Sequence, residues 1–322
     1  MPISANTGKA PHFILVASAG MGHLNPMTRL AATLSSRGCD VSFVAAHPTV
    51  SLAESNSISQ LLSSFPKIKS LNLPLVQPGP TATAADPFFL RFDSIGRSAD
   101  NLPPLLEHPD SVSAIVIDVS LSFGYVPVAK KLNVPCYMLF TTCASLFSLF
   151  AYFPTHQIAD TCRPIGDIEI PGALTVPRSS VIPFLRDPNH PFTTLFLRNS
   201  RLLPEFDGVL INTFEALEPE VIAAIRKGHV APNLPPVISV GPLLPLDGQR
   251  PTSLSAWLDR QPPRSVVYVS FGNRTAMTRE QIGELGRGLE GSGYRFLWVV
   301  KTKVVDRDEG SGNGEVEEAL GE

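Results

Sequence analysis

Short apolar runs along this chain alternate with longer segments in which apolar residues recur every three or four positions. The runs have the length of strands buried on both faces, and the segments between them have the spacing of amphipathic helices. Strands that alternate with helices favour an α/β domain with a parallel sheet. We predict strands at Phe13–Ala17, Val41–Ala45, Ala114–Ile117, Cys136–Phe140 and Gly208–Asn212.

The first helix has clear sequence signals at both ends. Asn25 is predicted to cap it, Pro26 suits its first position, and Gly38 is predicted to end it. Further helices are predicted at Phe123–Lys131 and Leu217–Arg226. Two looser stretches, residues 73–87 and 165–191, are predicted to be binding loops, because long connections in a compact domain usually have that role.

A polar stretch with Gly and Pro separates this unit from a second one. There we predict strands at Val266–Ser270 and Phe296–Val300, and between them a helix that Thr278 and Gln281 open as a capping box. We therefore predict a Rossmann-like N-terminal domain at residues 1–246, a linker at 247–252 and a second Rossmann-like domain at 253–322. Two parallel strands and one long helix cannot cover both faces of a sheet, so we expect the second domain to be incomplete in this sequence.

The composition is that of a folded protein without a strongly charged surface. Apolar residues make up 43% of the chain and charged residues 17%, with a net charge of −3 and no basic stripe, which argues against nucleic-acid binding. The four cysteines, Cys39, Cys136, Cys143 and Cys162, form no C-x-x-C pair and stand at no metal-ligand spacing. We expect free thiols in the cytoplasm, no metal, and a monomer whose partners are small molecules.

One uncharged segment, Val134–Phe153, is long enough to span a bilayer. Because Pro135 and several hydroxyl side chains interrupt it, we interpret it as a strand followed by a buried helix that Thr141 or Thr142 caps. A membrane span is the alternative. Only Lys9 precedes the short first strand as a basic residue, so we do not expect a cleaved signal.

The loop after the first strand carries a titratable side chain, His23. Ligands of open parallel sheets bind beyond the C-terminal ends of the strands, and an imidazole with an ordinary pKa of ~6.5 suits a general base. Asp118 follows another strand and should emerge at the same edge, where a buried carboxylate would fix the tautomer of the imidazole. The alternatives are a histidine that binds its own backbone and an aspartate that caps the next turn.

Two glycine-containing loops are candidates for binding phosphate or sugar. Gly20 and Gly22 precede a helix and would let such a group approach backbone N–H groups. Ser270, Gly272 and Asn273 form a similar loop after a strand of the second unit, and an ordinary tight turn is the alternative there. The first loop lacks the third glycine of the dinucleotide fingerprint, and no acidic residue ends the second strand, which disfavours an NAD(P)-linked oxidoreductase.

Aromatic residues cluster in the segment that begins at Asp86. Phe88, Phe89 and Phe92 are predicted to line a flat apolar pocket. At helical spacing the same residues also fit an ordinary hydrophobic core, and the sequence leaves both interpretations open.

Together these residues resemble the plant-type UDP-sugar-dependent glycosyltransferases, which have the two-domain GT-B fold. The resemblance covers residues 11–305 and includes the run Gly22-His23-Leu24-Asn25-Pro26. It implies that His23 is the catalytic base and that Asp118 orients it. It also implies that Thr141 lies near the donor sugar and that Ser270 touches the donor diphosphate.

Within that family the chain is most similar to flavonoid C-glucosyltransferases. Four stretches carry this likeness: Asp86–Phe89, Asp187–His190, Phe271–Arg274 and Trp298–Lys303. The resemblance implies an inverting reaction in which His23 deprotonates a phenolic hydroxyl. The phenolate oxygen, or a ring carbon beside it, then attacks the sugar of UDP-glucose, which is a co-substrate, and no further cofactor is implied.

One family signature is missing from these residues. The family's His-Cys-Gly-Trp-Asn-Ser run, which binds uracil, ribose and most of the sugar, does not occur here. Without those contacts the anomeric carbon is poorly oriented, so we expect weak donor binding and slow or no turnover. A chain that only binds phenolic small molecules is the alternative.

Overall fold

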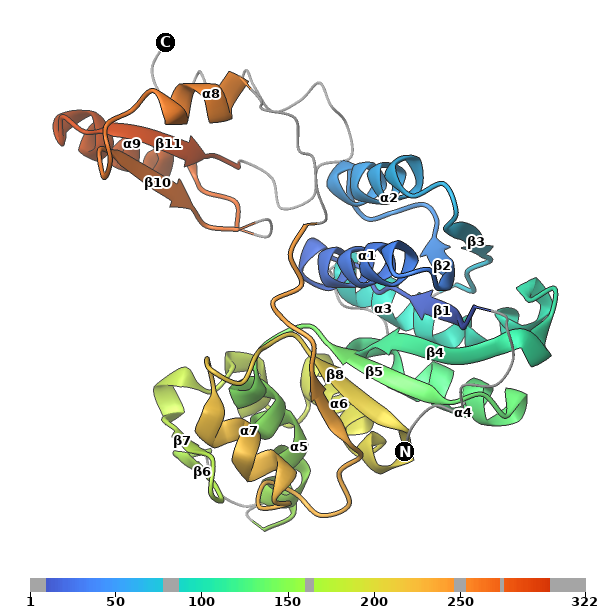
Figure 1. Cartoon of the computed structure of the whole chain (residues 1–322). Helices are drawn as coiled ribbons and strands as arrows, with labels where there is room; N and C mark the ends of the chain where they lie inside the picture. Colours follow the sequence, from blue (N-terminus) through green and yellow to red (C-terminus); the bar gives the residue numbers. More distant parts are fainter. Residues whose placement is uncertain (1–9, 78–86, 160–164, 246–252, 273–274, 302–322) are drawn as a thin grey trace. The chain divides into compact units, whose positions relative to one another are not determined.

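The computed structural model describes residues 10–77, 87–159, 165–245, 253–272 and 275–301 (Figure 1). The chain divides into two compact units. Unit 1 comprises Met1–Thr49 with Ser57–Pro245, and unit 2 comprises Val50–Asn56 with Leu246–Glu322. The predicted linker, residues 247–252, lies outside the described residues.

Unit 1 is built on a seven-stranded sheet with the strand order β3-β2-β1-β4-β5-β8-β9, in which every neighbouring pair is parallel. The prediction of an α/β fold with a parallel sheet is therefore confirmed. Residues 114–118 of β4 are buried without a break, as expected for a strand covered on both faces. The strands are β1 His12–Val16, β2 Asp40–Ala46, β3 Lys69–Leu73, β4 Val112–Asp118, β5 Cys136–Phe140, β8 Gly208–Ile211 and β9 Val237–Ser239.

Helices connect these strands and pack around the sheet (Figure 1). Their apolar faces bury the core that the alternating pattern of the sequence predicts. A short antiparallel pair, β6 (Ile168–Ile170) and β7 (Leu174–Val176), lies in the connection after α5. The helices are α1 Met21–Ser36, α2 Leu52–Ser64, α3 Pro87–Arg97, α4 Ser122–Leu132, α5 Ala144–Ala159, α6 Pro191–Ser200 and α7 Pro219–Arg226.

The strand order creates a switch point between β1 and β4. From β1 the chain runs outward through β2 and β3, and it returns to β4 on the other side of β1. Connections that leave two neighbouring parallel strands in opposite directions open a crevice beyond the carboxyl ends of those strands. The residues that follow β1 and β4 are therefore the first place to look for a site.

The first helix begins earlier than the sequence predicts. Gly20 has a φ of 90°, and its carbonyl oxygen accepts hydrogen bonds from the N–H groups of His23 and Leu24 at 3.0 and 2.9 Å. This turn starts α1 at Met21, so the predicted cap at Asn25 is wrong and Pro26 lies inside the helix. His23 consequently stands in the first helical turn, not in a loop.

The cap predicted for α5 is also wrong. This helix begins at Ala144, and its first two amides donate to a carboxylate from a distant segment, Glu218. Neither Thr141 nor Thr142 fills that position. Among the described residues, no helix is both long and apolar enough to cross a membrane.

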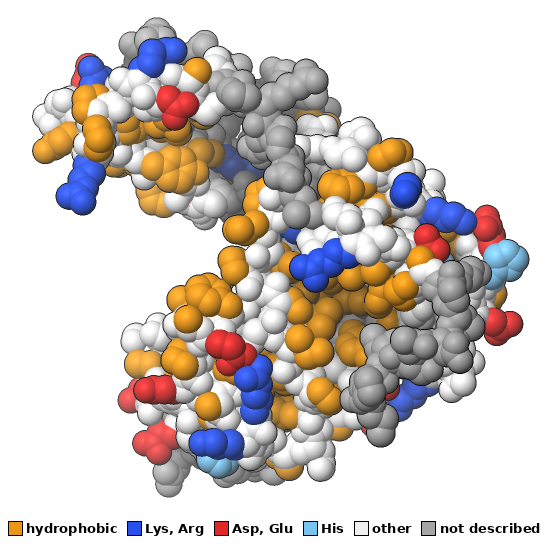
Figure 2. Space-filling view, viewed as in Figure 1, with side chains coloured by type: hydrophobic (Ala, Val, Ile, Leu, Met, Phe, Trp, Pro, Cys, Tyr) orange, Lys and Arg blue, Asp and Glu red, His pale blue; other side chains and the backbone are white. Residues whose placement is uncertain are grey.

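The described residues of unit 2 include a parallel pair of strands, β10 (Val266–Ser270) and β11 (Arg295–Val299), and the helices α8 (Ser253–Asp259) and α9 (Arg279–Gly291). The predicted capping box is confirmed. The Thr278 side chain accepts from the Gln281 N–H, and the Gln281 side chain accepts from the Thr278 N–H. Hydrophobic side chains stand at the surface of this unit (Figure 2). Tyr268 and Phe271 are among the exposed ones.

Candidate active site

His23 and Asp118 meet at the switch point of the sheet. His23 projects from the first turn of α1, and Asp118 is the last residue of β4. Nδ1 of His23 lies 2.9 Å from Oδ2 of Asp118. The aspartate side chain is fully buried, whereas 31% of the histidine side chain is exposed. The pair therefore combines a carboxylate shielded from water with an imidazole that a ligand can reach.

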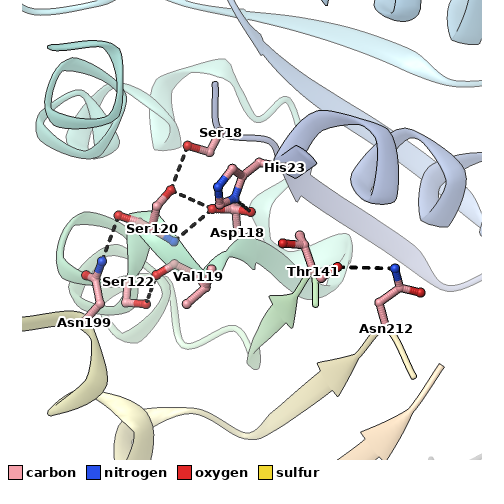
Figure 3. A network of polar contacts seen from close by, with 9 residues as sticks. All are labelled: Ser18, His23, Asp118, Val119, Ser120, Ser122, Thr141, Asn199 and Asn212. Carbon is pink, nitrogen blue, oxygen red and sulfur yellow. Dashed lines mark hydrogen bonds and ion pairs between the residues drawn. The ribbon is translucent and has the colours of Figure 1, made fainter. Parts of the chain in front are cut away.

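The carboxylate of Asp118 stays charged although it is buried. Burial alone would raise its pKa, but the charge of His23 and hydrogen bonds from His23 and Ser120 outweigh it and hold the pKa of Asp118 below its ordinary value. An ionised carboxylate only accepts hydrogen bonds, so Nδ1 of His23 carries the proton between them. In the neutral imidazole, Nε2 is then the basic nitrogen. Figure 3 shows the contact between the two side chains.

Asp118 also caps the following turn, the role that was weighed as an alternative. Its Oδ1 accepts from the backbone N–H of Ser120 at 2.9 Å. One oxygen thus binds the turn and the other faces His23, so the two roles are compatible.

An apolar cavity of about 270 Å³ opens beside His23. Among the described residues, its lining includes no Asp, Glu, Lys or Arg, and the polar side chains there are His23 and a few hydroxyl and amide groups. Such a cavity suits an uncharged, flat ligand whose polar groups face the imidazole. Its lining comprises Gly22, His23, Phe92, Val119, Ser120, Phe140, Thr141, Thr142, Leu146, Phe150, Ile182, Phe192, Leu195, Phe196 and Asn199.

The aromatic residues predicted for the acceptor pocket take different places. The Phe92 ring lies edge-on to His23, with 5.5 Å between the ring centroids and 68° between their planes, and it lines the cavity. Phe89 packs behind Phe92, with 6.0 Å between centroids. Phe88 belongs to α3, but its side chain lies outside the described residues.

Several cavity residues were missed in the sequence. Phe192 and Phe196 come from α6, and their rings pack together, with 5.8 Å between centroids. A spacing of four residues after Pro191 is a helical signal that could have identified them. Asn199 lies on the next turn of the same helix and also lines the cavity.

Helix α3 carries Phe92 and packs closely against α4. A Cβ at Gly124 would lie 2.0 Å from the backbone oxygen of Gly96, far inside van der Waals contact. A Cβ at Gly96 would meet the ring of Phe123 at 2.1 Å. Both positions therefore need glycine for the two helices to approach this closely.

Two of the predicted donor residues share the cavity with His23. Gly22 and Thr141 both belong to its lining. The backbone oxygen of Thr141 also accepts from Nδ2 of Asn212 at 3.3 Å, which ties the loop after β5 to the end of β8 (Figure 3).

Glu218 holds the same loop from the other side. Its carboxylate accepts hydrogen bonds from the amides of Ala144 and Ser145 and from the hydroxyls of Ser145 and Thr213, at 2.6–2.9 Å. Partial burial would raise its pKa, but these hydrogen bonds lower it below the ordinary value. The N-terminus of α5 is thus satisfied by the protein's own carboxylate.

The other predicted donor residues belong to unit 2. Ser270 ends β10, and Gly272 follows with a φ of 83°. The N–H of Gly272 lies 3.4 Å from Oγ of Ser270, so the two form a tight turn. Asn273 lies outside the described residues.

Other binding functions find little support in the part of the chain that the structure describes. No group of three His, Cys, Asp or Glu side chains there is placed to hold a metal ion. On the face drawn in Figure 2, Lys and Arg side chains are dispersed among acidic and apolar ones, without a continuous basic stripe.

Proteins that are similar to this chain in sequence or in fold include named UDP-glycosyltransferases and structures solved with UDP bound. UDP-glycosyltransferase CGT of Oryza sativa subsp. indica is 49% identical over 324 residues, which cover 98% of this chain and 69% of the relative. The crystal structure of LpCGTa in complex with UDP has 42% identity and a TM-score of 0.77, and the match covers 90% of this chain and 66% of that one. Phytolacca americana UGT2, complexed with UDP-2fluoro-glucose and pterostilbene, has 29% identity and a TM-score of 0.77, with 93% and 68% covered.

No protein-family model matches the chain. The relatives nevertheless share its sequence across almost its whole length, and the solved structures share its fold. This chain, which spans about two thirds of the length of those relatives, belongs to the plant UDP-glycosyltransferases.

Proposed function

We propose that this protein transfers glucose from UDP-glucose to a phenolic acceptor, with inversion at the anomeric carbon. The observation that carries the proposal is the 2.9 Å contact between a reachable imidazole and a buried carboxylate at the switch point of the sheet. His23 is the general base, and Asp118 holds it in the reactive tautomer and stabilises the imidazolium that forms.

The reaction proceeds as one displacement. Nε2 of His23 takes the proton from a phenolic hydroxyl, and the phenolate oxygen attacks the anomeric carbon of the sugar. The bond from that carbon to the diphosphate oxygen breaks as the new bond forms, and UDP leaves with the electron pair. Attack opposite the leaving group inverts the anomeric centre.

The acceptor is proposed to be a planar phenol, such as a flavonoid. The described residues that line the cavity beside His23 are mostly apolar and include no Asp, Glu, Lys or Arg, and Phe92 contributes an aromatic ring to the lining. Phe89 and Phe88 are proposed to support that wall from α3. The complex of Phytolacca americana UGT2 with pterostilbene supports an acceptor of this class.

The same deprotonation is proposed to allow a C-glycosidic bond in place of the O-glycosidic one. A phenolate shares its negative charge with the ring carbons beside the oxygen, so one of them can attack in place of the oxygen. The proton on that carbon then passes to water, which restores the aromatic ring as a phenolate, and protonated His23 returns its proton to the phenolate oxygen. The resemblance to flavonoid C-glucosyltransferases favours this branch of the reaction.

For the donor, Gly22 and Thr141 are proposed to lie near the sugar, and Ser270, Gly272 and Asn273 near the diphosphate. Solved relatives bound to UDP and to UDP-2fluoro-glucose support a UDP-sugar as co-substrate. We expect weak donor binding by these 322 residues, because they include no His-Cys-Gly-Trp-Asn-Ser run. A cytoplasmic location is part of the proposal, because Cys39, Cys136 and Cys143 are free thiols.

The test is incubation with UDP-glucose and a trihydroxyphenyl acceptor, with the product detected by mass spectrometry. A glucosylated product that disappears in His23→Ala supports the proposal, and fragmentation separates a C-link from an O-link. If calorimetry shows that the phenol binds but no product forms at any donor concentration, the chain is a phenol-binding protein.

A further inference from the structure

Both oxygens of the Asp118 carboxylate have fixed partners. Oδ2 faces Nδ1 of His23, and Oδ1 accepts twice from Ser120, from its backbone N–H at 2.9 Å and from its hydroxyl at 2.6 Å. A carboxylate bound at both oxygens cannot rotate without losing hydrogen bonds. Ser120 therefore controls which way Asp118 points.

Only one arrangement of the hydroxyl hydrogens of Ser18 and Ser120 satisfies both hydrogen bonds. The hydroxyl oxygens of Ser18 and Ser120 lie 2.7 Å apart, and both side chains are buried. The Ser120 hydroxyl has a single hydrogen, and the carboxylate of Asp118 can only accept. That hydrogen therefore points to Asp118, and Ser18 donates to Ser120. Figure 3 shows the contacts among the three side chains.

The turn that carries Ser120 is itself held in place. Nδ2 of Asn199 donates to the Ser120 carbonyl at 3.0 Å, and its Oδ1 accepts from the N–H of Phe123 at 3.1 Å. Ser122 lies in the same turn, but its hydroxyl donates to the carbonyl of Val119, not to the carboxylate. Ser120 and Ser122 are thus a matched pair that differ in their contact with Asp118.

We infer that Ser120 is a positioning residue for the base: through Asp118 it keeps the proton of neutral His23 on Nδ1, so that Nε2 is the unprotonated nitrogen that takes a proton from the acceptor. Among the described residues, His23 is the titratable group paired with Asp118. The inference rests on the proposed function for its catalytic meaning. The tautomer itself can be measured without turnover.

The experiment is ¹⁵N NMR of the histidine side chains in the full chain at alkaline pH, where ring nitrogens with and without a proton have distinct shifts. His23→Gln identifies the His23 signals by their loss. Asp118→Asn is the positive control, because its amide can donate to Nδ1 and reverse the tautomer. Ser122→Ala is the matched negative control.

In the wild-type protein we expect His23 to be protonated almost entirely on Nδ1. In Ser120→Ala the ratio of the Nδ1–H to the Nε2–H tautomer should fall by about threefold to tenfold. The hydroxyl bond to Oδ1 is lost and only the backbone bond remains, so the carboxylate of Asp118 is held less firmly toward Nδ1 of His23. Ser120→Thr should restore the ratio, and Ser122→Ala should leave it unchanged.

The inference is overturned if Ser120→Ala keeps the wild-type ratio while Asp118→Asn changes it. Should Ser120→Ala fail to fold by circular dichroism, Ser18→Ala decides. It removes the donor to Ser120, so it should shift the ratio in the same direction by a smaller factor, and an unchanged ratio contradicts the inference. A chain that shows the expected tautomers but forms no product leaves Ser120 in its role and refutes only the catalytic proposal.

Discussion

Both units contain parallel strands, but the side chains on those strands are mostly buried in unit 1 and largely exposed in unit 2. Phe43, on β2 of unit 1, is fully buried, whereas Tyr268 on β10 and Phe296 on β11 of unit 2 are 66% and 39% exposed. In unit 1 the inner strands have neighbours on both edges and helices on their faces, whereas the described residues of unit 2 provide a single strand pair with the helices α8 and α9. A parallel strand thus contributes to stability in proportion to what covers it, not to how apolar it is.

The largest contrast should be in catalysis. Replacing His23 by alanine removes the base and should lower the rate of product formation by about 10²–10⁴-fold. Ser270→Ala in unit 2 removes one hydroxyl that is proposed to touch the donor, and should cost less than about tenfold. Initial rates at saturating acceptor measure both, and equal losses would contradict the division of roles.

Stability should show the next largest contrast. Phe43→Ala leaves a cavity in the core and should lower the free energy of unfolding by about 3–5 kcal/mol. Phe296→Ala removes a partly exposed ring and should cost about 1 kcal/mol or less. Urea unfolding followed by far-UV circular dichroism compares them. Similar costs would show that unit 2 is covered in solution.

Glu218 offers a smaller, pH-dependent test within unit 1. Glu218→Gln weakens the cap on α5 and should cost about 1–2 kcal/mol at pH 7, after allowance for its partial exposure. Because folding lowers the pKa of Glu218, its charge stabilises the protein above the ordinary glutamate value of 4.5, and this contribution is lost as the pH falls further.

The stabilities of the wild type and Glu218→Gln should therefore converge as the pH falls below 4.5. Urea midpoints measured from pH 7 down to pH 3.5 follow the difference. Glu220→Gln, on the exposed start of α7, is the control and should change little at any pH. A gap that widens toward low pH would contradict the role of the charge.

The smallest effect concerns the capping box of unit 2. Thr278→Ala should destabilise the start of α9 by about 1 kcal/mol, and amide hydrogens of that helix should exchange about fivefold faster. Thr275→Ala, an exposed neighbour outside the box, serves as the control. Hydrogen exchange read by mass spectrometry on peptides from α9 measures the change, and unaltered rates would mean that the cap does not limit opening of the helix.

The sequence predicts the sheet well because its strands are continuous apolar runs. Ala114–Ile117 and Cys136–Phe140 both match strands of the structure closely. A strand that is buried on both faces is a continuous run of apolar residues, which can be recognised in the sequence without knowledge of distant contacts. The strand Lys69–Leu73 went unpredicted, because it lies at the edge of the sheet and three of its five residues are exposed.

The site could be predicted only in part. His23 and Asp118 could be predicted because one follows β1 and the other ends β4. The C-terminal edge of a parallel sheet is a general site of ligand binding. The predicted start of α1 is wrong, because Gly20, with a positive φ, precedes the first helical residue, whereas the sequence suggests Asn25 as the cap. The cap from Glu218 joins residues 74 positions apart, and no local pattern carries such a contact.

The close packing of α3 on α4 has a consequence for how the acceptor cavity can change. Gly124 and Gly96 contribute nothing to the lining, yet the approach they permit sets how near the Phe92 ring comes to His23. A single methyl group at Gly124 meets backbone, which cannot move aside as a side chain can, so α3 itself has to shift. The width of the cavity therefore depends on the packing of α3 against α4. A substitution at Gly124 would change which substrates fit without changing any residue that lines the cavity.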